Sequence, residues 1–127
     1  MFWVEFSEDE RELSFHIAYE SFSELTDDMR ISIAHEYHVH ECAQQIVRFR
    51  KNLINKKDDE LEIGYCTINT DFNKRTISLK FKQMQILFDM DYEIYIHDRR
   101  SYYEDLLRSM NYICEFINSS DKSSDLT

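Results

Sequence analysis

Apolar and polar residues alternate near the start of the chain, a pattern typical of half-buried β-strands. The alternation covers residues 2–7 and 13–19, and a charged turn at residues 8–11 lies between them. These two segments are expected to pair as an antiparallel hairpin with one apolar face. A polar connection over residues 21–30 leads to a third alternating segment, residues 31–39, which we expect to be a central strand.

The period of the pattern becomes helical after this third segment. Cys42, Ile46, Phe49 and Leu53 are spaced to share one face, and basic residues are concentrated in the second half of the segment. Positive charge is favourable at the C-terminal end of a helix dipole, so the pattern predicts a helix over about 41–56.

A second helix is predicted over about 101–118, where apolar residues again repeat at helical spacing. Ser101 and Glu104 have the Ser-x-x-Glu spacing of a capping box, in which the serine oxygen accepts a hydrogen bond from a backbone N–H of the first turn. Residues 119–127 are rich in serine and aspartate and are predicted to form a disordered tail.

Alternation returns between the two predicted helices. Residues 61–67 and 77–81 are expected to form a second hairpin around a turn at residues 71–74. Residues 84–97 keep one apolar phase, which fits either one long strand or two short ones.

These elements predict a single α+β domain over residues 1–118. The expected order is βββα-ββ(β)-α, with a mainly antiparallel sheet of about five to six strands and both helices packed on it. A chain of 127 residues with 43% hydrophobic content can bury one core of this kind.

The charge of the chain limits its partners. The formal net charge is −10, which repels nucleic acid and anionic membranes and favours a basic protein as partner. No apolar run is long enough to span a membrane and no signal peptide is evident, and the three cysteines lie far apart. We therefore expect a cytoplasmic protein with reduced thiols.

Three side chains of the third alternating segment could bind a metal. On a strand, Glu36, His38 and His40 would project from the same face, and a His-x-His pair binds metal when another element supplies further ligands. The opposite interpretation, a solvated polar strand face, is the one that we favour. No motif of a catalytic nucleophile or glycine-rich phosphate loop is present, so neither an enzyme nor a cofactor is expected.

Acidic residues occur mainly in the predicted turns and connections. This distribution leads to the hypothesis of a small inhibitor, of the type of bacterial immunity proteins and antitoxins, that neutralises a cationic toxin or enzyme, possibly a nuclease, by direct contact. The partner-binding carboxylates would be those of Glu8, Asp9, Glu10, Asp27, Asp28, Asp58, Asp59 and Glu60.

Aromatic side chains would anchor such an interface, and Trp3, Tyr102 and Tyr103 are the candidates. Two alternatives remain open. One is a metal-binding domain or metal-dependent enzyme that uses Glu36, His38 and His40, and the other is a non-catalytic subunit of a larger assembly.

Overall fold

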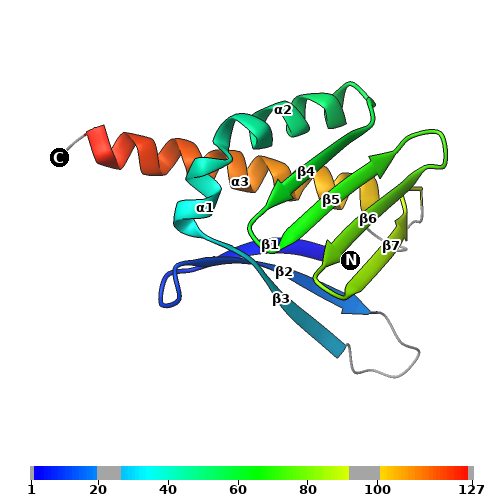
Figure 1. The fold of residues 1–127 in the computed structure, drawn as a ribbon, viewed down its shortest axis with the longest axis horizontal. Coiled ribbons are helices and arrows are strands. Elements are labelled where there is room, and N and C mark those ends of the chain that lie inside the picture. Colours follow the sequence, from blue (N-terminus) through cyan, green and yellow to red (C-terminus); the bar gives the residue numbers. More distant parts are fainter. Residues whose placement is uncertain (1, 20–26, 92–100, 126–127) are drawn as a thin grey trace.

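The computed structural model of the chain describes residues 2–19, 27–91 and 101–125, and it describes side chains over residues 2–17, 29–91 and 101–119. Within these ranges the chain is α+β, as predicted, but its strands form two antiparallel sheets instead of one (Figure 1).

The first sheet has three strands in the order β1 (Phe2–Ser7), β2 (Glu12–Tyr19) and β3 (Asp27–His35). The predicted first hairpin is confirmed: Phe2 lies opposite Ile17, and Ser7 lies opposite Glu12. The third strand starts at Asp27, inside the segment that was predicted to be a polar connection. Much of that connection, residues 20–26, lies outside the described residues.

The second sheet has four strands in chain order, each paired with the next by a hairpin. They are β4 (Asp59–Ile63), β5 (Cys66–Asp71), β6 (Thr76–Phe81) and β7 (Met84–Asp89). The prediction of one strand over 61–67 is wrong, because a two-residue turn at Gly64 and Tyr65 divides this segment between β4 and β5. Strand β7 ends at Asp89, and residues 92–100, which include the rest of the predicted 84–97 strand, lie outside the described residues.

Three helices complete the described fold: α1 (Glu36–Glu41), α2 (Ala43–Ile54) and α3 (Tyr102–Asp125). Helices α2 and α3 confirm the two predicted helices, and α3 continues beyond the predicted end near residue 118. The Ser101 hydroxyl oxygen accepts a hydrogen bond of 3.3 Å from the Glu104 N–H, as the capping box predicted.

Helix α1 replaces the end of the predicted strand over 31–39. A β-bulge in β3 precedes this helix: Leu13 lies opposite Ala34 and Ser14 lies opposite Ser32, so Ile33 has no residue opposite it. A bulge bends the strand and shifts its alternation, and the two consecutive residues Ile33 and Ala34 are both buried. Beyond the bulge the chain turns into a helix that begins at Glu36.

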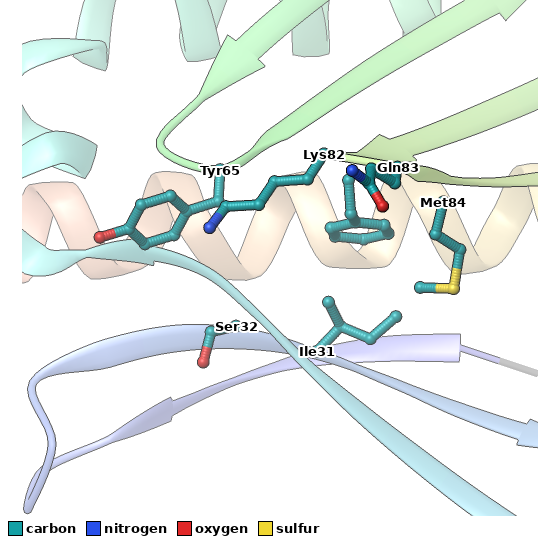
Figure 2. Close-up of a pocket in the computed structure, with 7 residues that line it drawn as sticks. Ile31, Ser32, Tyr65, Lys82, Gln83 and Met84 are labelled. Atoms are coloured by element: carbon teal, nitrogen blue, oxygen red, sulfur yellow. The ribbon is translucent and has the colours of Figure 1, made fainter.

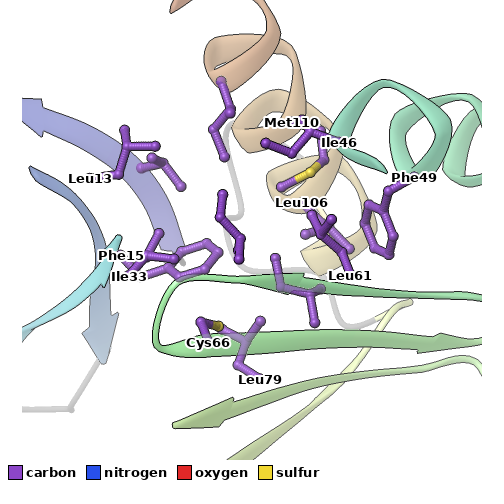
Figure 3. Close-up of a cluster of buried hydrophobic side chains, with 14 of the residues drawn as sticks. Leu13, Phe15, Ile33, Ile46, Phe49, Leu61, Cys66, Leu79, Leu106 and Met110 are labelled. Atoms are coloured by element: carbon purple, nitrogen blue, oxygen red, sulfur yellow. The ribbon is translucent and has the colours of Figure 1, made fainter. Parts of the chain in front are cut away.

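One core joins the two sheets and the helices. Figure 3 shows side chains from β2 and β3, from the four-stranded sheet and from α2 and α3 converging on a common interior. Aromatic contacts connect the two sheets directly: the rings of Phe2 and Phe88 lie 5.0 Å apart, and those of Phe15 and Phe81 lie 6.4 Å apart. The two sheets therefore belong to one packed unit.

Two hairpin loops end in the same way. Arg11 closes the β1–β2 loop and Arg75 closes the β5–β6 loop, both with positive φ angles, 55° and 57°. The backbone carbonyl of each arginine accepts a hydrogen bond from a later segment, and each guanidinium binds a carboxylate there, Glu36 for Arg11 and Asp91 for Arg75. These contacts compensate for a backbone conformation that is costly for a residue with a side chain.

The sheets also meet through the backbone, at the only glycine of the chain. Gly64 has φ +57°, and a Cβ atom at this position would lie 2.4 Å from the Ile33 carbonyl oxygen and 2.5 Å from the Ala34 Cβ. The neighbouring Tyr65 N–H donates a hydrogen bond of 2.6 Å to the same carbonyl. The β4–β5 turn therefore lies directly against the bulge of β3.

We expect the substitution Gly64→Ala to lower the free energy of unfolding by about 2–4 kcal/mol, because both the positive φ and the close contact oppose a Cβ. Urea denaturation measures this loss. Lys82→Ala is the matched control: Lys82 occupies the same position of the β6–β7 turn, φ is +36°, and a Cβ is already present. The control is expected to stay within about 0.5 kcal/mol of the unsubstituted protein, and a Gly64→Ala protein of equal stability would contradict the packing described above.

Candidate functional site

A cleft of about 570 Å³ opens where β3 faces the tips of two hairpins of the four-stranded sheet (Figure 2). Its apolar surface comes from Ile31 of β3, Phe81 of β6 and Met84 of β7. Its polar lining residues are Ser32, Tyr65, Lys82 and Gln83. The cleft is wide open to solvent, and its lining combines apolar side chains with a few polar groups.

A cluster of four rings, which we call the ring cluster, adjoins this cleft. It consists of His35, Tyr37, His38 and Tyr65. The ring of His38 lies 4.4 Å from that of Tyr37 and 6.3 Å from that of Tyr65, so it bridges the two tyrosines. Tyr37 is 61% exposed and Tyr65 is 46% exposed, so two large aromatic side chains lie at the surface on either side of His38.

Carboxylates surround the ring cluster. Glu12 lies 3.3 Å from His35, and Glu41 lies 3.7 Å from His38. Burial raises the pKa of the Cys42 thiol, and the charges of Glu41 and Glu62 raise it further, so these two carboxylates lie at the same corner. The ring cluster is thus an exposed aromatic surface within a negatively charged environment.

The structure does not assemble the metal site suggested by the sequence. Glu36, His38 and His40 lie on helix α1 rather than on a strand, and residues two apart on a helix point to nearly opposite sides. Glu36 binds Arg11, His38 faces Glu41, and the His40 ring lies 5.8 Å from that of Phe116. Within the described residues, no group of three histidine, cysteine or acidic side chains is placed to hold a metal ion.

The predicted acidic contact residues do not form one patch. Glu8, Asp9 and Glu10 are exposed on the β1–β2 loop, and Glu10 pairs with Arg30 at 2.9 Å. In Figure 1 this loop lies at the same end of the molecule as α1, whereas the start of β4 lies at the other end. The side chains of residues 27 and 28 lie outside the described residues.

The carboxylates at the start of β4 already have partners within the chain. Asp58 accepts a hydrogen bond of 2.6 Å from the Phe72 N–H. Asp59 accepts hydrogen bonds from the Asn52 amide and the Arg48 guanidinium, which ties β4 to helix α2. The Glu60 side chain is exposed.

The predicted aromatic anchors are half-buried and have contacts within the chain. Trp3 stacks on His16 at 5.3 Å, and Tyr102 stacks on Phe2 at 5.9 Å. The Tyr103 hydroxyl donates a hydrogen bond of 2.8 Å to the Leu53 carbonyl. Tyr37 and Tyr65, two of the three exposed tyrosines among the described side chains, were missed, because each lies at a boundary between elements that the sequence pattern did not reveal. The third, Tyr112, lies on α3, and its hydroxyl accepts a hydrogen bond from the Phe6 N–H.

Comparison of the chain with protein-family models, with curated proteins and with solved structures finds no significant match. Within the part of the chain that the structure describes, no helix is both long and apolar enough to cross a membrane.

Asp59 is expected to stabilise the fold in a pH-dependent way. Burial opposes ionisation of its carboxyl group, but hydrogen bonds from Asn52, the Glu60 backbone and Arg48 outweigh this effect, so the pKa of Asp59 lies below its ordinary value of 3.8. The stabilisation is fully present above the unfolded-state pKa and is lost as the pH falls through the lowered folded-state pKa.

We therefore predict that Asp59→Asn lowers the free energy of unfolding by about 1–2 kcal/mol at neutral pH, and that this difference shrinks in acid. Urea denaturation at neutral pH and below the ordinary pKa measures both effects. Glu60→Gln, which changes the adjacent exposed carboxylate, is the control and is expected to have little effect at either pH. A constant difference between Asp59→Asn and the original chain across this range would contradict the assignment.

The three thiols are expected to differ in reactivity. Cys66 is buried, and burial raises the pKa of its thiol to about 12, whereas Cys42 and Cys114 are half-buried. Because the thiolate is the reactive form, iodoacetamide should label Cys66 at least about tenfold more slowly than Cys42 in the folded protein. Mass spectrometry of labelled peptides measures this ratio. In urea the difference should disappear, and fast labelling of Cys66 in the folded protein would contradict its burial.

Proposed function

We propose that the chain is a small acidic inhibitor of the immunity-protein or antitoxin type, which acts in the cytosol and neutralises a cationic toxin or enzyme by direct protein–protein contact. The observation that carries this proposal is the exposed ring cluster within a chain of net charge −10. Tyrosine side chains dominate the binding energy of many protein interfaces, and negative charge speeds association with a basic partner.

The geometry suggests one particular contact surface for the inhibitor. Arg11, which closes the β1–β2 loop, binds Glu36 at the start of α1, so this loop lies beside the helix that carries Tyr37. The surface proposed for the partner therefore combines Tyr37 and Tyr65 of the ring cluster with the carboxylates of Glu8, Asp9 and Glu41. The start of β4 is left out of it, because Asp58 and Asp59 bind groups within the chain.

Affinity purification from the native host, followed by mass spectrometry, tests the proposal. We expect one basic partner whose activity the chain inhibits and whose association rate falls about tenfold or more as ionic strength rises. A Tyr37→Ala, Tyr65→Ala double variant should bind this partner at least about tenfold more weakly, because both changes remove an aromatic anchor.

The matched control is a Val47→Ala, Leu87→Ala double variant. Val47 is 55% exposed and Leu87 is 67% exposed, but they lie on α2 and β7 and are not part of the ring cluster. The control should bind like the original chain. Loss of binding in both double variants, a partner whose association is insensitive to salt, or the absence of inhibition would each contradict the proposal.

A further inference from the structure

The two hairpin tips that border the cleft have different residues at the same turn position. Both turns contain two residues, Gly64 and Tyr65 between β4 and β5, and Lys82 and Gln83 between β6 and β7. In both, the first residue has a positive φ, +57° for Gly64 and +36° for Lys82. Two-residue hairpins favour glycine at such a position, and only the first turn has it.

The strain at Lys82 lacks the compensation that other positive-φ residues have. The guanidinium groups of Arg11 and Arg75 bind carboxylates, and Lys56 follows the C-cap of α2, where its N–H bonds the Leu53 carbonyl. Among the described residues, the Lys82 side chain makes no ion pair or hydrogen bond. Strained residues that the fold does not require are often kept for a functional reason.

The Lys82 side chain lines the cleft. In Figure 2 the Lys82 side chain extends toward Tyr65, Met84 lies on the other side of it, and Ile31 faces them from β3. Ser32, the polar lining residue that β3 contributes, is already engaged, because its hydroxyl donates a hydrogen bond of 3.0 Å to Glu12. The cleft therefore combines apolar walls with the Tyr65 and Gln83 side chains and with the Lys82 ammonium group, which has no ion pair among the described residues.

We infer that this cleft binds a small apolar monocarboxylate. Its carboxylate would pair with the Lys82 ammonium group, and its hydrocarbon part would lie on the apolar side chains of the cleft. A single ammonium group neutralises one negative charge, and the net charge of −10 repels more highly charged anions such as phosphates. The cleft volume of about 570 Å³ falls in the range of small-molecule sites.

A titration with two matched probes, followed by amide NMR, tests the inference. The probes are 4-phenylbutyrate and 4-phenylbutan-1-ol, which share the apolar part and differ in charge. The carboxylate should bind about two- to fivefold more tightly than the alcohol, the range of a solvent-accessible ion pair. Without the ion pair the alcohol should bind more tightly than the carboxylate, because a charged group is more costly to remove from water than a hydroxyl. The shifted amides should include Ile31, Tyr65 and Met84.

Substitutions of Lys82 separate the ion pair from the fold. Lys82→Met should remove the preference for the carboxylate, and Lys82→Arg should keep it. Lys82→Gly should also remove the preference for the carboxylate. This loss would not result from unfolding, because glycine is the residue best suited to the turn. Lys74→Met, which removes an exposed charge at the opposite end of β6, is the control and should leave the affinities for both probes unchanged.

Three results would overturn the inference: equal or tighter binding of the alcohol to the original chain, a carboxylate preference that survives Lys82→Met, or amide shifts confined to other surfaces. None of these depends on whether the chain inhibits a toxin, because the titration involves no protein partner.

Discussion

The contact between the β4–β5 turn and the bulge of β3 is the constraint on which the rest of this structure depends. Gly64 lets the turn approach the backbone of Ile33, and the Tyr65 N–H bonds the carbonyl exposed there. This contact fixes the two sheets relative to each other at one corner. The same corner holds the cleft and the ring cluster, so the candidate site exists because two hairpins that are distant in sequence meet at a glycine.

Local pattern was sufficient wherever an element is defined by its own residues. The apolar spacing of Ile46, Phe49 and Leu53 identifies α2, since all three are buried on one face. The Ser101 cap likewise marks the start of α3. The first hairpin was predictable for the same reason, because strict alternation on both strands allows one register with a buried face. In each case the decisive interactions lie within the element or in its immediate neighbour.

Long-range contacts decided the rest, and the sequence pattern does not contain them. The alternation of apolar and polar residues continues across Gly64, so the sequence pattern does not reveal a turn there. The turn that divides the predicted strand is apparent only from the contact between Gly64 and Ile33. The bulge in β3 likewise depends on how Leu13 and Ser14 pair with it. Beyond this bulge the histidine segment forms α1 instead of a strand, so Tyr37 is exposed and the side chains of the predicted metal cluster are separated.

The distribution of charge shows why acidity alone could not locate the site. Carboxylates in turns looked available to a partner, yet Asp58 and Asp59 stabilise the start of β4 by accepting hydrogen bonds. Conversely, nothing in the sequence pattern singles out Lys82, because one lysine in a turn is ordinary. It becomes unusual only beside Gly64, at the equivalent position of the neighbouring turn. The single glycine, Gly64, lies where the backbone contact leaves no room for a side chain. Lys82 lies at the equivalent position of the neighbouring turn, where the cleft is open.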